Sequence, residues 1–259
     1  MDDDVILRLD SMGLAFGGVL ALDGLSCEVR RGDIFGIIGP NGAGKTSAVN
    51  CISGFYRPQR GEVYLEGRRI TGLRPDRIAR LGVSRTFQNI HLYAGMTVID
   101  NLMAARHLYF KATWLEGLVY YGRTHREEVQ NRRRVEETID FLGLARWRKA
   151  VVGALPYGLR KRIDLGRALV QEPRLLLLDE PMAGMNVEEK EDMARSIQDV
   201  KEEKRITTVL IEHDMEVVMD LTDRIAVLDF GRKIAEGTPA EIKDNPAVVQ
   251  AYLGDETVT

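Results

Sequence analysis

Short apolar runs, each followed by glycine or by polar residues, set the pattern of this chain. Ile34–Ile38 precedes a glycine-rich stretch, Leu175–Leu178 precedes Asp179-Glu180, and Thr207–Ile211 precedes Glu212-His213. Runs of this length without polar alternation are typical of strands buried on both faces of a parallel sheet. With helices between them, the pattern favours an α/β fold in which helices cover both faces of a mainly parallel sheet.

The N-terminal part carries a different pattern. From about Ile6 to Gly72, short strands alternate with glycine-rich turns, which predicts an antiparallel β region beside the parallel sheet. Pro75–Leu81 predicts a short helix ended by Gly82, and Val83–Phe87 predicts a strand that carries Gln88 at its end.

The middle of the chain predicts helices. Thr97, followed three residues later by Asp100, marks a helix start, and helical periodicity extends to about Val170. Phe110–Arg123 breaks this periodicity and predicts a loop-rich excursion, whose aromatic residues could pack in the core or face a membrane partner. We therefore expect a core made of residues 1–96 and 171–259, with a helical lobe, 97–170, inserted into it.

One stretch of the sequence indicates which class of ligand the chain binds. Gly39-Pro40-Asn41-Gly42-Ala43-Gly44-Lys45-Thr46 fits the phosphate-loop pattern G-x-x-x-x-G-K-[ST], between the strand Ile34–Ile38 and a helix predicted over Lys45–Ile52. Backbone N–H groups of such a loop cradle phosphate oxygens, and the helix N-terminus adds a positive dipole end. These residues and Ser47 are the expected nucleotide-binding residues, with Lys45 on the β- and γ-phosphates and the Thr46 hydroxyl on Mg²⁺. The alternative is a glycine-rich turn that only caps the helix.

Two acidic residues follow a later strand. Asp179 is placed to hold the Mg²⁺ water shell, and Glu180 to act as the general base on the attacking water. A solvated Asp-Glu turn is the alternative. His213 follows the next apolar strand, which favours a γ-phosphate contact over a surface or capping role.

Leu155-Pro156-Tyr157-Gly158-Leu159-Arg160-Lys161-Arg162 lies between these motifs. With it, the chain resembles the nucleotide-binding subunit of an ABC (ATP-binding cassette) transporter from about Val5 to Gly254. The parts come in that family's order: Phe16, the phosphate loop, Gln88, the signature segment around Gly158, Asp179-Glu180 and His213.

The resemblance implies further roles. Phe16 would stack on adenine, Gln88 would touch Mg²⁺ or the attacking water, and Gly158 would meet the γ-phosphate bound by a second ATP-binding subunit. An ordinary core phenylalanine and a polar loop residue are the alternatives for Phe16 and Gln88. The implied partners are a second ATP-binding subunit, identical or different, in a head-to-tail dimer, integral membrane permease subunits and, indirectly, a solute-binding protein.

A subgroup resemblance is closer still. Met182–Asn186, Ile211–Met215 and the tail from Glu236 to Gly254 resemble ATP-binding subunits of branched-chain amino acid importers, which also serve other small solutes. The signature departs from Leu-Ser-Gly-Gly-Gln, because Pro156 and Tyr157 replace Ser and the first Gly, and Leu159 replaces Gln. A hydroxyl contact to the partner's γ-phosphate is lost at Pro156. Arg160–Arg162 then reads as a solvated helix face or as an electrostatic compensation for that hydroxyl.

The composition of the chain limits the partners and the cellular location that we expect for it. A net charge of −3 over 259 residues gives no reason to expect nucleic acid binding. Cys27 and Cys51 are expected to be buried, reduced thiols. The acidic N-terminus shows no secretory signal and no apolar stretch is long enough to cross a bilayer, so we expect a cytoplasmic protein, peripheral on the inner face of the cell membrane.

Other functions fit less of the pattern. A phosphate-loop kinase needs no signature, no acid directly after Asp179 and no His213. A non-transport ABC ATPase usually carries two cassettes or a long coiled coil, and a regulatory module that hydrolyses poorly would not need Glu180. The ATPase of a lipid or other exporter remains the nearest transport alternative, and the transported substrate cannot be read from this chain.

Overall fold

The computed structural model describes residues 4–109 and 123–255. The predicted excursion at Phe110–Arg123, which includes Trp114, lies outside the described residues except for Arg123. The contacts divide the chain into two compact units, one made of Met1–Gln88 with Arg174–Thr259 and the other of Asn89–Pro173. The second unit is wider at both ends than the helical lobe expected at 97–170.

In the first unit, the described residues form a six-stranded sheet in the order β10-β9-β3-β8-β7-β6. The bounds are β3 Ile34–Ile38, β6 Val83–Arg85, β7 Leu175–Asp179, β8 Thr207–Ile211, β9 Arg224–Asp229 and β10 Arg232–Gly237. All neighbours pair in parallel except β9 and β10, which form an antiparallel edge. Every residue of β3, β7 and β8 is buried, as expected for central strands covered on both faces.

A second, four-stranded antiparallel sheet is formed in the described part of this unit, in the order β2-β1-β4-β5. Its strands are β1 Val5–Phe16, β2 Val19–Arg30, β4 Arg60–Leu65 and β5 Arg68–Arg69. The expectation of short strands was wrong for β1 and β2, which have 12 residues each. Both remain paired through shifts of register, one of them next to Ser11 with φ 49°, because a bulge absorbs an extra residue without ending the ladder.

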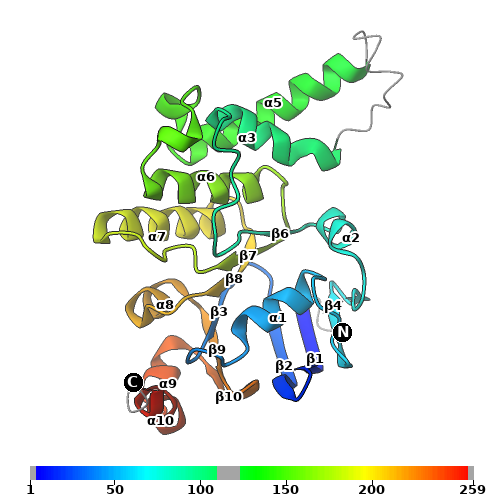
Figure 1. Cartoon of the computed structure of the whole chain (residues 1–259), viewed down its shortest axis with the longest axis vertical. Helices are drawn as coiled ribbons and strands as arrows, with labels where there is room; N and C mark the ends of the chain where they lie inside the picture. The colour runs from blue at the N-terminus through cyan, green and yellow to red at the C-terminus, as the bar shows by residue number, and fades with distance from the viewer. Residues whose placement is uncertain (1–3, 110–122, 256–259) are drawn as a thin grey trace. The chain divides into compact units, whose positions relative to one another are not determined.

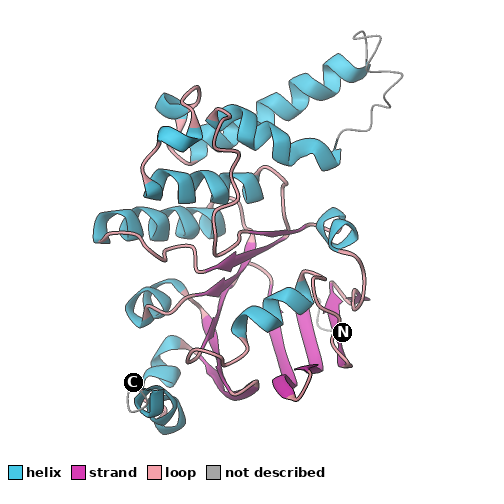
Figure 2. Ribbon diagram, viewed as in Figure 1, coloured by secondary structure: helices cyan, strands magenta, loops and turns pink. Residues whose placement is uncertain are grey.

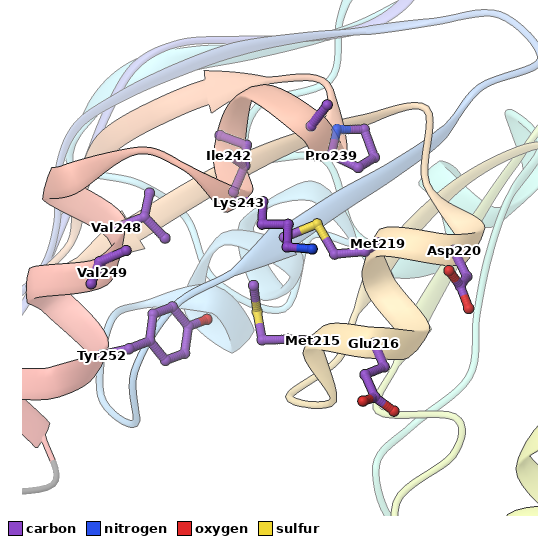
Figure 3. A pocket seen from close by; sticks show the side chains of 11 residues that line it. Met215, Glu216, Met219, Asp220, Pro239, Ile242, Lys243, Val248, Val249 and Tyr252 are labelled. Carbon is purple, nitrogen blue, oxygen red and sulfur yellow. The ribbon is translucent and has the colours of Figure 1, made fainter.

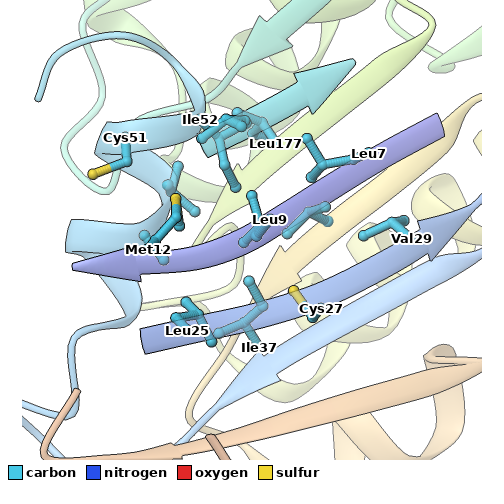
Figure 4. Close-up of a cluster of buried hydrophobic side chains, with 14 of the residues drawn as sticks. Leu7, Leu9, Met12, Leu25, Cys27, Val29, Ile37, Cys51, Ile52 and Leu177 are labelled. Atoms are coloured by element: carbon cyan, nitrogen blue, oxygen red, sulfur yellow. The ribbon is translucent and has the colours of Figure 1, made fainter. Parts of the chain in front are cut away.

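The helices of this unit are α1 Lys45–Ile52, α2 Pro75–Arg80, α7 Val187–Glu202, α8 Met215–Leu221, α9 Pro239–Lys243 and α10 Pro246–Asp255. Helix α1 and the antiparallel sheet pack on one face of the large sheet, where Met12, Ile52 and Leu177 share one core (Figures 1 and 4). On the other face, Val218, Ile242 and Val248 of α8, α9 and α10 pack against Ile38. Alternate residues of each strand therefore supply both cores.

The two cysteines belong to the first of these cores. Both are free and buried, as expected. Burial raises the pKa of the Cys27 thiol to about 12 and that of Cys51 to about 11. Both thiols are therefore protonated at neutral pH.

The described part of the second unit consists of helices and loops (Figure 2). The α-helices are α3 Val98–Ala105, α5 Arg123–Phe141 and α6 Tyr157–Leu169, and three short 3₁₀ helices cover Arg106–Tyr109, Ala145–Trp147 and Val152–Ala154. Helix α3 begins as predicted, with the Thr97 hydroxyl accepting the Asp100 N–H at 3.3 Å. Leu102, Ile139 and Ile163, one from each α-helix, are fully buried.

One predicted strand is shorter than expected. Residues Val83–Phe87 were expected to be extended up to Gln88, but β6 ends at Arg85. Within the part of the chain that the structure describes, β6 is the outermost strand of the sheet and pairs only with β7, over Leu175–Leu177, and the Thr86 N–H makes a last bond to the Leu177 carbonyl. Gln88 therefore stands beyond the strand, in irregular backbone. Among the helices that the structure describes, none has the length and apolar character needed to cross a membrane.

Candidate active site

The phosphate loop joins β3 to α1 with the bounds that the sequence predicts. A Cβ added at Gly39 would lie 2.0 Å from the Leu228 carbonyl oxygen, and one at Gly44 would lie 2.4 Å from the Ala21 carbonyl oxygen. Both glycines also have positive φ, of 148° and 100°. Gly42, with φ 79°, has no neighbour within 4 Å of such an atom. Close packing thus requires glycine at 39 and 44, and conformation alone favours it at 42.

The loop surrounds a positive charge. Lys45 is 5% exposed, and its Nζ donates to the carbonyl oxygens of Gly39 at 2.7 Å and Pro40 at 2.8 Å. Gly44 is the N-cap of α1 and supplies no side-chain cap, so the first-turn N–H groups keep their capacity for an anion. Asn41, Gly42 and Thr46 are exposed, Pro40 and Ser47 are half-buried, and Ala43 is buried. A buried ammonium beside uncapped N–H groups fits a polyphosphate.

The two acids lie at the end of β7, as predicted. In the parallel register Asp179 is opposite Ile211, and β3 pairs with β8 at Ile37, so the phosphate loop, the acids and His213 follow the same edge of the sheet. Glu180 leaves the strand with φ 49°, in the left-handed region, and its N–H is bonded to the Ile211 carbonyl at 2.9 Å. Such strain in a residue with a side chain is held by its surroundings and is found at functional sites.

Both carboxylate oxygens of Glu180 have partners. The Gln88 amide Nε2 donates to Oε2 at 2.7 Å, and His213 Nε2 lies 2.5 Å from Oε1. Glu180 is 8% exposed. The structure thus brings Gln88, Glu180 and His213 together, although the sequence predictions had placed Gln88 and His213 against the metal and the phosphate.

Glu212 accepts backbone hydrogen bonds from the segments that follow β7 and β8. Its carboxylate accepts the backbone N–H of Met182 at 2.8 Å and that of His213 at 3.3 Å. Burial raises the pKa of Glu212, and the neighbouring charge of Glu180 adds to the rise, while the two backbone bonds oppose it. Glu212 therefore links the segment after β7 to the segment after β8.

Asp179 is paired with a cation. Arg85, at the end of β6, donates from Nη2 to Asp179 Oδ2 at 2.7 Å, and the two side chains are 8% and 3% exposed. The same guanidinium donates from Nη1 to Asn50 Oδ1 at 2.6 Å and to Ser53 Oγ at 3.1 Å, both on or next to α1. One side chain thus joins β6, β7 and α1.

The donor set suits the metal that the sequence predicts. Thr46, Asp179 and Gln88 offer a hydroxyl, a carboxylate and an amide oxygen, which are hard ligands of the kind that Mg²⁺ accepts together with phosphates. Because the Gln88 amide nitrogen points to Glu180, a metal contact would use its oxygen. Among the described residues, no group of three His, Cys, Asp or Glu side chains could hold a metal ion.

Phe16, at the end of β1, is 48% exposed, which excludes the ordinary core phenylalanine that was its alternative. Its ring meets that of Tyr56 edge-on, with centroids 5.1 Å apart. The exposed part of the ring can stack on a base.

The predicted signature segment lies in the second unit. Pro156 is the N-cap of α6 without a side-chain cap bond, Tyr157 is exposed and Gly158 is buried in the first turn. The interpretation of Arg160–Arg162 as a solvated face was wrong for Lys161, which is 3% exposed, and the two arginines are half-buried. The Arg160 guanidinium carbon and the Lys161 ammonium nitrogen lie 5.7 and 5.9 Å from the centre of the Tyr157 ring, so both cations face this ring.

Comparison with known proteins settles the family. The model of the ABC transporter family matches residues 22–183, more than half of the chain. The chain is 40% identical over 250 residues to the high-affinity branched-chain amino acid transport ATP-binding protein BraF of Pseudomonas aeruginosa, covering 96% of this chain and 98% of that protein. It is 38% identical to the corresponding protein LivG of Escherichia coli K12, with the same coverage. The chain belongs to the ABC transporter family.

Solved structures agree with this assignment. A nucleotide-free ATP-binding cassette from an ABC transporter is 34% identical, with a TM-score of 0.83 over 96% of this chain and 98% of that one. A cassette in its ADP conformation is 33% identical, with a TM-score of 0.84 over 96% and 99%. The model of the branched-chain amino acid ATP-binding cassette transporter family also matches residues 232–258. As an ABC cassette, this chain is an ATP-hydrolysing enzyme with the α/β phosphate-loop fold expected from its sequence.

Two residues that contact the candidate active site were missed in the sequence. Arg85 had been read only as part of the strand before Gln88, and Glu212 only as part of the turn before His213. A signal existed for Arg85, because a charged residue beside Val83 and Ser84 must find a buried partner. Glu212 gave no such signal, since an acid directly after a strand usually faces solvent.

A cavity of about 820 Å³ lies between α8, α9 and α10 (Figure 3). Its lining includes Met215, Met219, Val248 and Tyr252. Burial raises the pKa of Tyr252 to about 12, against the effect of a hydrogen bond with the backbone of Gly39. The C-terminal helix therefore contacts the first residue of the phosphate loop.

Proposed function

We propose that this chain is the ATP-hydrolysing subunit of an importer for branched-chain amino acids or related small solutes. The observation that carries its chemistry is the Glu180 carboxylate, held by Gln88 and His213 at the sheet edge that also bears the phosphate loop. The names of BraF and LivG and the C-terminal match at residues 232–258 support the solute class.

Binding of ATP uses the first unit. Lys45 would exchange its bonds to the Gly39 and Pro40 carbonyls for bonds to the β- and γ-phosphates, while the backbone N–H groups of the segment from Gly39 to Ser47, other than Pro40 which has none, would hold phosphate oxygens. Phe16 would stack on adenine. Thr46, Asp179 and Gln88 would hold Mg²⁺, partly through water, and the ion would neutralise charge that develops on the phosphates.

Hydrolysis then needs a positioned water. Glu180 takes a proton from a water in line with the γ-phosphate, and its strained backbone and two side-chain partners fix the carboxylate for this step. His213 and Gln88 each contact one oxygen of the Glu180 carboxylate. A shift of this carboxylate when the γ-phosphate is bound or cleaved can therefore move either side chain.

The working assembly contains more than this chain. We infer a head-to-tail dimer with an identical or homologous ATP-binding subunit, in which Gly158 and the α6 N-terminus meet the nucleotide of the partner. The dimer would act at the cytoplasmic face of the membrane on integral permease subunits, and a solute-binding protein would deliver the cargo.

The test is reconstitution. The chain and its membrane permease subunits would be placed in liposomes with the solute-binding protein, and phosphate release would be measured with leucine, isoleucine or valine, and separately with small amides. We expect stimulation by the branched-chain amino acids or by a related small solute, and none with Glu180→Gln. Hydrolysis that responds to none of these solutes would refute the importer assignment.

A further inference from the structure

Arg85 occupies an unusual position for a fully charged side chain. It is 8% exposed and faces Asp179, the proposed magnesium ligand, at 2.7 Å. Its Nε has no hydrogen-bond partner among the described residues. An orphaned donor is costly in a buried place, so the guanidinium is oriented by its other contacts, to Asp179, Asn50 and Ser53.

The same residue is coupled to the segment that carries Gln88. The guanidinium lies over the Phe87 ring at 4.9 Å, and Gln88 follows directly with its bond to Glu180. The short segment Arg85–Gln88 is therefore tied to the adjacent acids at both ends, by Arg85 to Asp179 and by Gln88 to Glu180.

Charge decides what this arrangement does. A buried carboxylate without a partner is strongly unfavourable, so Asp179 needs a cation whenever no metal is bound. A dication placed on the same carboxylate is repelled by the guanidinium beside it. Phosphate oxygens of a bound nucleotide offset that repulsion, and water alone does not.

We propose that Arg85 is the resident counter-cation of Asp179, a positioning residue that keeps the carboxylate paired and makes Mg²⁺ binding depend on nucleotide. This inference rests on the proposed role of Asp179 in holding the metal. Arg85 thereby controls when Mg²⁺ binds, because the two cations share the negative charge of the Asp179 carboxylate.

The test measures Mg²⁺ binding without nucleotide. Wild type, Arg85→Gln and Arg85→Met would be titrated with MgCl₂ at constant ionic strength, following thermal unfolding and the heat of binding. Without Mg²⁺ we expect the variants to unfold roughly 6 °C or more below wild type, because a buried ion pair is broken. Mg²⁺ should restore about half or more of that loss, since a dication replaces the missing charge, and should leave wild type nearly unchanged. Arg85→Gln keeps hydrogen-bonding groups and serves if Arg85→Met does not fold.

Two variants locate the effect. Arg174→Met breaks an ion pair with Glu66 on the exposed surface of the same unit and should show no recovery with Mg²⁺. Adding Asp179→Asn to Arg85→Gln should abolish the recovery. Equal Mg²⁺ responses in Arg85→Gln and wild type, or a recovery that survives Asp179→Asn, would overturn the inference.

Asp179→Asn with Arg85 intact separates this inference from the function it rests on. If that variant hydrolyses Mg-ATP at the wild-type rate, the proposed metal site itself is wrong. If it is inactive while Arg85→Gln shows no Mg²⁺ recovery, Asp179 keeps its role and only the role of Arg85 falls.

Discussion

Two helices of this protein, α1 and α6, begin in glycine-containing segments that are built differently. At α1, Gly44 is the N-cap and Gly39 begins the loop, and neither position has room for a Cβ. At α6, the N-cap is the exposed Pro156, and Gly158 follows the exposed Tyr157 in the first turn. The first segment is fixed by contacts within its own unit, whereas the second leaves exposed residues beside its glycine.

We propose this difference as the reason why the phosphate loop keeps its family pattern and the signature segment does not. A loop enclosed by the Leu228 and Ala21 carbonyls admits one residue type at each contact. If the segment around Gly158 completes its contacts on a second ATP-binding subunit, as we propose, it is constrained by that partner, and its backbone N–H groups can act with several side chains around them. The following variants test this contrast.

Glu180→Gln should have the largest effect. The amide keeps the shape and can still bond to Gln88 and His213, but it cannot take a proton, so turnover should fall by roughly 10²–10⁴. ATP binding should persist, and dimers should accumulate in gel filtration with Mg-ATP. Phosphate release at the wild-type rate would show that another group is the base.

Gly158→Asp should lower turnover by roughly a hundredfold in the assembled transporter, because bulk and negative charge would meet the γ-phosphate of the partner's nucleotide. ATP binding by the isolated chain should be unchanged in calorimetry. Gly158→Asn adds similar bulk without the charge and should be less harmful. Normal hydrolysis by Gly158→Asp would mean that α6 does not act as a signature helix.

Gly39→Ala should destabilise the fold by about 3 kcal/mol or more, since the new Cβ would lie 2.0 Å from the Leu228 carbonyl oxygen at φ 148°. Gly42→Ala is the matched control, with only the conformational cost of about 1 kcal/mol at a site with open space. Denaturant unfolding measures both. Equal losses would show that close approach is not what selects glycine at position 39.

Lys45→Ala should have the smallest effect of the four, a loss of ATP affinity of roughly tenfold or more, as expected for removal of a charge-assisted contact worth roughly 1.5–3 kcal/mol. Lys45→Met keeps the aliphatic stem and should lose affinity similarly, which separates charge from packing. Calorimetry of nucleotide binding gives the result. Unchanged affinity in both variants would remove Lys45 from the phosphate cradle.

Local pattern was sufficient for the framework of the site. We could predict the phosphate loop, the strands that lead to Glu180 and His213, the helix that starts at Lys45 and the helix capped by Thr97, because each depends on residues within a few positions of one another. The end of β6 could not, since it depends on how far a neighbouring strand continues to pair.

The contacts within the candidate active site were decided by tertiary structure. Arg85 reaches Asp179 across 94 positions of sequence, and Gln88 reaches Glu180 across 92. Nothing in local periodicity encodes which strand lies beside which, so neither the pairing of Asp179 nor the two partners of Glu180 could be deduced. The burial of Lys161 was missed for the same reason: a charge run looks solvated until its neighbours in space are known. The sequence by itself determined which chemical groups are present and at which strand ends, and the packed sheet determined which of them touch.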